Sequence, residues 1–377
     1  MKRIMLPFLL CVFFFAGCTK TTDSESLKKE VVPIEGFTNT EYNSETDNQY
    51  YFSEYSGLVA VDGGYYKNYS GFLYFFDKKS KENHPVCSNL SCAHNTEECD
   101  AYLGDAMWLQ YYEGYLYYVI YDYHDMEAIL YRKSLDGSVV EKIGKILRAD
   151  DIPIIIIHRG YAYFKWDSEN DSTLYRIKLE KDAIREKLFV YDDKFYPGLL
   201  RMKGYGDGIM FEAAHDLNDD GTGAVYNLYY YDSSENAVKL VKEGTDGEYA
   251  IAGGMIYYYN EGGVYQYDIS TKTDSMFYPM EEMVCISYDG RYLYLDNVYA
   301  MTMNQISEKE HRVYVVDMKG QLIETIPLSE NLCYYGDMDY LFQSMAIGYQ
   351  MLDKTQLGTS KQEWIKVPMY TYDMLED

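Results

Sequence analysis

Positive charge is scarce in this sequence. Its 377 residues contain 34 Lys and Arg against 60 Asp and Glu, so the formal net charge is −26 at pH 7. A chain this acidic is repelled by phosphodiester backbones and by anionic lipid surfaces, so we expect no nucleic-acid partner. The negative charge is compatible with other classes of ligand: cationic ligands, metal ions, neutral glycans, peptides and proteins. Acidity of this kind also keeps an exported protein soluble.

Short catalytic motifs are also missing. The sequence contains neither G-x-S-x-G nor H-E-x-x-H. The glycine-rich stretch at 204–208 precedes no helical pattern, which argues against a phosphate-binding loop. Carboxylates are numerous enough for a glycosidase-type pair, but spacing singles out none.

Long apolar runs are confined to the N-terminus. Lys2 and Arg3 precede a dozen apolar residues at 4–15, which is shorter than the roughly 20 residues that cross a bilayer. The small residues that follow, with Cys18, resemble the lipobox of bacterial lipoproteins, apart from Phe15 in place of the usual Leu. We therefore predict a signal peptide over 1–17 and a lipid on Cys18. The alternative is an ordinary signal peptide followed by an incidental cysteine.

Residues 18–48 combine this cysteine with a polar stretch that has no periodicity. We expect a flexible tether here, leading to a folded, monomeric body over 49–377 on the outer face of the cell membrane.

Tyrosine is the most conspicuous residue, with 45 copies. One short word recurs, in which an aliphatic residue or Met precedes Tyr and the fifth position is often Asp. Its copies are LYFFD (73–77), LYRKS (130–134), LYRIK (174–178), LYYYD (228–232), VYQYD (264–268), VYVVD (313–317) and MYTYD (369–373). Glycine-led words such as GYAYFKW (160–166) precede most of them, and both kinds of word have the composition and alternation of β-strands.

A unit of about 50 residues with several strands is typical of a β-propeller blade. Seven copies predict an all-β propeller of seven blades, with six or eight as alternatives. The last word ends four residues before the C-terminus, so its blade lacks an outer strand of its own. Because an open ring would leave an unpaired edge, we predict that residues 50–54 supply that strand. We expect most tyrosines to pack between blades, and some to stack on sugars.

A cluster of cysteines with one histidine lies in the loop at 86–103. Cys87, Cys92, His94 and Cys99 have the spacing C-x4-C-x-H-x4-C, and three thiolates with one imidazole make a closed, structural zinc site. One disulfide with a free thiol is an alternative, because the loop is outside the cell. A loop with no special role is the third. The odd number of cysteines and the presence of His94 favour the metal.

This segment resembles one found in tyrosine-rich surface lipoproteins of Gram-positive anaerobes, many of them described only as domains of unknown function. The resemblance rests on the lipobox, the tyrosine words and the C-x4-C-x-H-x4-C segment followed by Ala101 and Tyr102. It implies a propeller at the cell surface and no established activity.

A second metal candidate is DLNDDGTG at 216–223. Asp216, Asn218 and Asp220 alternate as in the first half of a calcium loop, but the twelfth position is Asn227 where an EF-hand has Glu. A solvated turn is the alternative.

These features predict a lipid-anchored module that binds a glycan, peptide or protein. The alternative function is an extracellular hydrolase or lyase acting on a glycan or peptide, since propellers support both.

Overall fold

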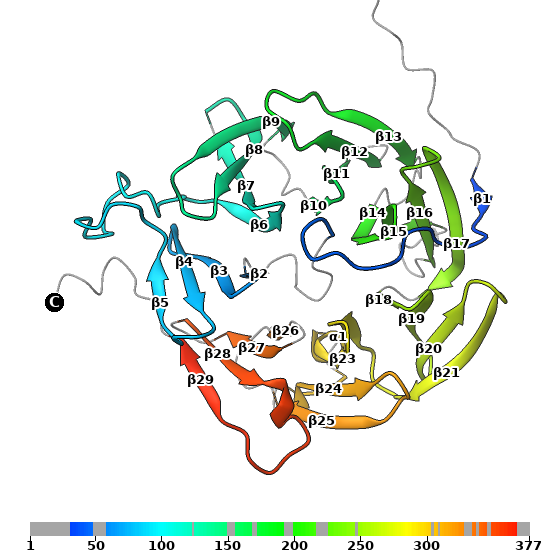
Figure 1. The fold of residues 1–377 in the computed structure, drawn as a ribbon. Coiled ribbons are helices and arrows are strands. Elements are labelled where there is room, and N and C mark those ends of the chain that lie inside the picture. Colours follow the sequence, from blue (N-terminus) through cyan, green and yellow to red (C-terminus); the bar gives the residue numbers. More distant parts are fainter. Residues whose placement is uncertain are drawn as a thin grey trace, which may run out of the picture.

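The computed structural model describes residues 31–47, 58–122, 124–148, 155–167, 172–191, 199–215, 225–245, 248–302, 305–307, 310–327, 334–336, 339–344 and 348–367. Over these residues the chain forms seven sheets arranged as a ring (Figure 1). The predicted all-β propeller is confirmed, with seven blades. In the described chain we find no helix with the length and apolar character needed to span a membrane.

Each blade contains four consecutive antiparallel strands, of which the first lies nearest the axis of the ring and the fourth lies at the rim. The first three blades are β2 (Leu58–Val61), β3 (Gly64–Tyr69), β4 (Phe72–Asp77) and β5 (Asn83–Pro85); β6 (Met107–Tyr112), β7 (Tyr115–Asp122), β8 (Glu127–Ser134) and β9 (Val140–Arg148); and β10 (Ile155–His158), β11 (Tyr161–Asp167), β12 (Ser172–Lys178) and β13 (Glu186–Tyr191). The fourth and fifth are β14 (Leu199–Tyr205), β15 (Gly208–His215), β16 (Val225–Asp232) and β17 (Ala237–Thr245); and β18 (Tyr249–Ala252), β19 (Met255–Asn260), β20 (Gly263–Asp268) and β21 (Thr273–Pro279). The last two are β22 (Cys285–Tyr288), β23 (Tyr292–Asp296), β24 (Arg312–Asp317) and β25 (Leu322–Pro327); and β26 (Tyr334–Gly336), β27 (Tyr340–Ser344), β28 (Tyr349–Asp353) and β29 (Trp364–Val367). The helix α1 (Val298–Thr302) lies between β23 and β24, and the 3-10 turn η2 (Lys354–Gln356) follows β28.

The recurring tyrosine word is the third strand of each of the first six blades. In four blades its Tyr faces an aromatic side chain directly across the ladder, and the rings stack at centroid distances of 5.7–6.0 Å. Cross-strand aromatic pairs of this kind stabilise a sheet beyond the area that they bury. The four pairs are Tyr118–Tyr131, Phe164–Tyr175, Phe211–Tyr229 and Tyr258–Tyr265.

The Asp at the end of the word closes the turn to the fourth strand. The Oδ1 atom of Asp77 accepts hydrogen bonds from the backbone N–H of Lys79 and Ser80, both at 2.7 Å. Asp232 and Asp268 make the same pair of bonds two and three residues on. The word therefore encodes a strand and the side-chain cap of the turn after it.

The seventh repeat lies elsewhere than predicted. The third strand of the last blade is β28, with the sequence YQMLD, and the outer strand is β29 from the same part of the chain. Among the described residues, the last blade thus has an outer strand of its own. Residues 50–54, which were predicted to supply that strand, and the word at 369–373 lie outside the described residues. Pattern matching missed β28 because Tyr349 and Gln350 stand where the word has an aliphatic residue and Tyr.

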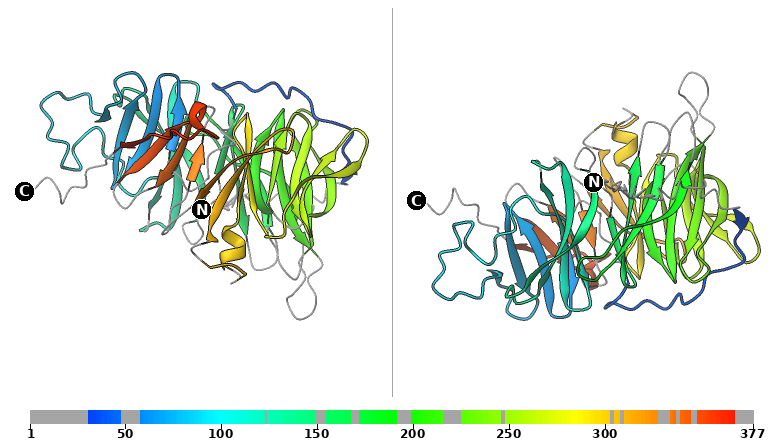
Figure 2. Two further views of the ribbon diagram at one scale, coloured as in Figure 1. Left: turned by 90° about the horizontal axis from the view of Figure 1, so that it is seen from below. Right: turned by 90° about the horizontal axis from the view of Figure 1, so that it is seen from above.

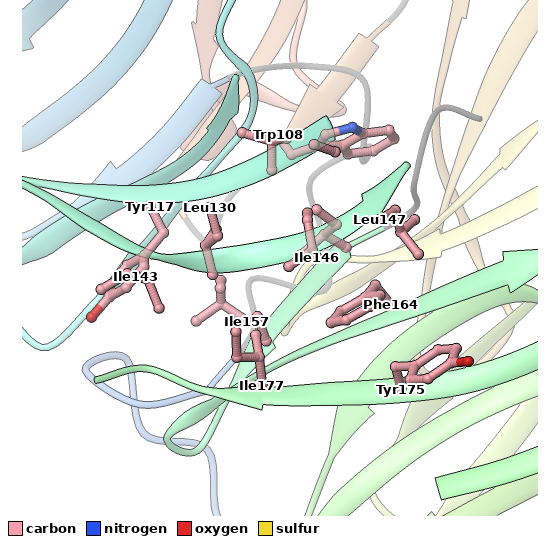
Figure 3. Close-up of a cluster of buried hydrophobic side chains, with 14 of the residues drawn as sticks. Trp108, Tyr117, Leu130, Ile143, Ile146, Leu147, Ile157, Phe164, Tyr175 and Ile177 are labelled. Atoms are coloured by element: carbon pink, nitrogen blue, oxygen red, sulfur yellow. The ribbon is translucent and has the colours of Figure 1, made fainter. Parts of the chain in front are cut away.

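Apolar side chains fill the seven seams between adjacent blades, with one buried cluster at each seam. Figure 3 shows the seam of the second and third blades, where Ile143 and Ile146 of β9 meet Ile157 and Phe164 of the next blade. Many of the largest fully buried side chains are tyrosines, including Tyr117 and Tyr163. Packing between blades therefore explains the tyrosines at these positions without a role in ligand binding.

The N-terminal strap, residues 31–47, is held against the propeller. Its strand β1 (Val32–Pro33) pairs in parallel with β17, and Phe37 meets the rings of Tyr205 and Tyr230 edge-on at about 5 Å. Figure 2 shows the strap on one face of the ring and α1 on the other. A flexible tether was expected over 18–48, but residues 31–47 are held against the propeller. The sequence analysis missed this because the segment is mostly polar and only a few apolar residues hold it.

Candidate functional site

The Cys/His loop interrupts the outer edge of the first blade. Its chain leaves the sheet after β5 and returns at 101–103, where the N–H of Leu73 donates to Ala101 O and that of Leu103 to Gly71 O, both at 2.7 Å. Between these points the loop extends outward from the rim (Figure 1). Strand pairing thus fixes both ends of the loop and brings its cysteines together.

All four predicted ligands converge. One ligand atom from each of Cys87, Cys92, His94 and Cys99 lies within 4.8 Å of all the others. A tetrahedral zinc site with Zn–S bonds of about 2.3 Å has edges of about 3.8 Å, so the group fits around one ion after small side-chain shifts. The described cysteines, which also include Cys285, form no disulfide.

Backbone amides support this arrangement. The N–H of His94 donates to Cys92 Sγ at 3.3 Å, and the N–H of Ala101 donates to Cys99 Sγ at 3.4 Å. His94 Nδ1 lies 3.5 Å from Cys99 Sγ. Bonds of this type orient thiolate ligands and lower the cost of their charge.

A buried lysine supplies charge to the cluster. Lys133, on β8 of the second blade, is 3% exposed. Burial lowers its pKa, while the negative charges of Asp100, Cys99 and Cys87 act in the opposite direction. Three thiolates with one Zn²⁺ have a net charge of −1, so an ammonium group here balances the occupied site.

A second group of charged side chains lies on the inner strands of the fourth and fifth blades. Arg201, on β14, places Nη1 2.9 Å from Glu212 Oε2 and Nε 2.8 Å from Glu248 Oε1. Its φ of 48° lies at the bulge where the β14–β15 register shifts. Such bulges re-aim a side chain, and here the bulge turns the guanidinium between two carboxylates.

Glu212 is the unusual member of this group. Its side chain is fully buried, and Thr245 Oγ1 lies 3.4 Å from Oε1. Burial raises the pKa of Glu212 to about 8; Arg201 opposes this shift, and Glu248 adds to it. Burial thus favours the protonated form of this carboxyl group, and the contact with Arg201 favours the ionised form. Sequence reasoning missed it, although a Glu between Phe211 and Ala213 in a buried strand was a usable signal.

A small hollow lies beside these charges. It is lined by Lys203, Gly204, Tyr205, Ala250, Ile251 and Tyr288, from the inner strands of three consecutive blades. The hollow and the charged group together form what we call the channel site: Arg201, Lys203, Glu212, Glu248 and Tyr288.

The remaining predicted sites fall outside the described residues. Cys18, and the calcium candidates Asp216, Asn218 and Asp220, are in this class. Only the order of the chain places the calcium candidates, between β15 and β16.

No family model matches this sequence, and no curated protein matches it. Solved structures do match. A prolyl endopeptidase is 11% identical, with a TM-score of 0.52 over 87% of this chain and 50% of that one. An acylaminoacyl peptidase is 9% identical, with a TM-score of 0.51 over 90% of this chain and 55% of that one. TolB from Acinetobacter baumannii is 12% identical, with a TM-score of 0.40 over 74% and 65%. This chain thus spans between half and two thirds of each of these proteins, and the likeness shows the β-propeller fold alone.

Proposed function

We propose that this protein is a lipid-anchored propeller on the outside of the cell, which binds a glycan or peptide at the channel site. The observation that carries the proposal is that the Arg201–Glu248 pair lies two residues before Lys203 and Ala250, which line a hollow between adjacent inner strands. Arg201 and Glu248 are each about one fifth exposed, so a ligand can exchange hydrogen bonds with both. Tyr288 adds an aromatic face of the kind that sugars and peptide side chains contact.

Binding is tested by screening the full-length chain in detergent against glycan and peptide arrays. Glu248→Gln removes one ionic partner of Arg201, and we expect it to weaken binding at least tenfold. Glu141→Gln is the matched control, because Glu141 also pairs with an arginine, Arg132, but lies on β9 of the second blade. Equal binding by both variants and the wild type would place the ligand elsewhere.

Anchoring is tested separately. In a bacterial host with lipoprotein processing, we expect the wild type to partition with membranes and Cys18→Ser to keep its signal peptide. A mature wild-type protein that starts after residue 18 and carries no lipid would contradict the anchor.

We further propose that Cys87, Cys92, His94 and Cys99 hold one structural zinc ion. Four protein ligands leave no open position for water, so the ion stabilises the loop and has no catalytic task. Native mass spectrometry of the full-length chain should show one zinc per chain, lost with chelator. A metal-free chain about 2 Da lighter than the reduced one would instead indicate a disulfide.

One observation favours the alternative of an extracellular hydrolase. Arg201 contacts two carboxyl groups, Glu212 and Glu248, and burial raises the pKa of the first to about 8, so the pair could divide into an acid and a base once movement of Arg201 exposes Glu212. If this is its task, Glu212→Gln abolishes glycan or peptide hydrolysis and leaves binding within a few-fold. Wild-type protein that binds a ligand without turning it over would exclude this role for that ligand.

A further inference from the structure

Among the described residues, the first and last blades exchange no strand, since all their described strands come from their own stretches of chain. Side chains of the two blades meet at the seam: the rings of Tyr65 and Phe342 meet edge-on at 4.7 Å, and Lys78 Nζ lies 2.8 Å from Asp339 Oδ2. Packing at this seam therefore contributes to holding the two ends of the ring together.

The Cys/His loop is built into this closing seam. Cys99 is 4% exposed and Ala101 is fully buried. Both belong to the hydrophobic cluster that also contains Tyr349, Met351 and Val367 of the last blade. The two end residues of the loop, Val86 and Leu103, belong to the cluster at the seam with the second blade, so the loop contributes to both seams of the first blade.

The middle of the loop is held by hydrogen bonds near the surface, among them those from the N–H and hydroxyl of Ser88 to Asp100 Oδ2, and has few buried side chains. Leu90 is fully exposed, and most side chains from 88 to 98 are exposed or half-exposed. A bound ion would tie Cys87 to Cys99 across this segment and fix the position of the Ala101 edge. Restricting the loop in this way removes conformations that compete with the packed seam.

We propose that a metal ion bound by Cys87, Cys92, His94 and Cys99 locks the first blade to the last, so that occupancy of the loop controls opening of the ring. This inference rests on the zinc site proposed above. Binding at a site and order at a seam are linked reciprocally: zinc stabilises the closed seam, and a loosened seam binds zinc more weakly by the same factor.

Hydrogen exchange of the full-length chain, with one equivalent of zinc and after chelation, tests the proposal. We expect chelation to speed exchange at least tenfold in β27, β28 and β29, and to leave β15 and β16 of the fourth blade unchanged. Faster exchange confined to 86–103, with zinc still bound one to one, would overturn the lock but leave the zinc site standing. A chain that binds no zinc overturns both.

The effect of the seam on zinc affinity gives a second measurement, which leaves the four metal-binding residues unchanged. Phe342→Leu loosens the seam, and we expect zinc affinity to fall at least fivefold in competition with a chromogenic chelator. Phe211→Leu is the matched control, since Phe211 is equally buried but lies at the seam of the third and fourth blades. Equal affinities for both variants would refute the coupling.

Discussion

The raised pKa of Glu212 has a consequence for stability that can be measured. Burial raises the pKa of this carboxyl group from 4.5, its ordinary value, to about 8 in the folded protein. Between these values the folded state keeps a proton that the unfolded state has released. Stability from this group is therefore fully present below pH 4.5 and is lost as pH rises through 8. The slope is about 1.4 kcal/mol per pH unit, and the whole interval amounts to about 5 kcal/mol.

Glu212→Gln isolates this effect, because glutamine is a neutral isostere of the protonated carboxyl group. We expect the free energy of unfolding of the variant, minus that of the wild type, to increase by about 1.4 kcal/mol per unit between pH 5 and 8. Taking the difference cancels every other titrating group. Urea denaturation followed by intrinsic fluorescence at each pH supplies both values.

Glu141→Gln again serves as the control. Its carboxylate is about one third exposed, so losing the pair with Arg132 should shift stability by less than about 1 kcal/mol. The reasoning about Glu212 is refuted if its difference stays flat or falls as pH rises. A flat difference would mean that Glu212 is already ionised in the folded state over this range, with Arg201 as its ionic partner.

Two further predictions concern the seams and the strap. Asp289 and Lys354 form a buried ion pair between the last two blades. Asp289→Asn should lower the free energy of unfolding by about 3 to 5 kcal/mol, because it leaves the buried ammonium group of Lys354 without its partner. Adding Lys354→Met in a double-mutant cycle should recover much of that loss. Arg159 binds Asp47 through Nε and Nη2 at 2.8 and 3.0 Å, so Arg159→Ala should cost about 2 to 3 kcal/mol and expose 31–47 to limited proteolysis. Cleavage at equal rates in wild type and variant would contradict the second expectation.

Several features of the fold could be read from local pattern. Period-two alternation marked six third strands correctly, and the Asp at the end of the word marked the turns. The seventh repeat was misplaced because β28 departs from the word at two positions, Tyr349 and Gln350. Whether a ring closes by strand exchange depends on which segments meet in space, and the number of sequence repeats does not specify this.

The candidate sites divide in the same way. The Cys/His cluster was predictable, because its four ligands lie within thirteen consecutive residues and a short loop must bring them together. The channel site was not, because Arg201 and Glu248 are 47 positions apart and meet only where two blades touch.

The sequence by itself determined the β-structure, the repeat and the Cys/His cluster, because each depends on neighbours along the chain. The tertiary structure decided the rest: which strand is third in the last blade, where the strap lies, and which glutamate is buried beside Arg201. Those outcomes depend on burial and on contacts between distant segments, and burial is set only when all seven blades are in place.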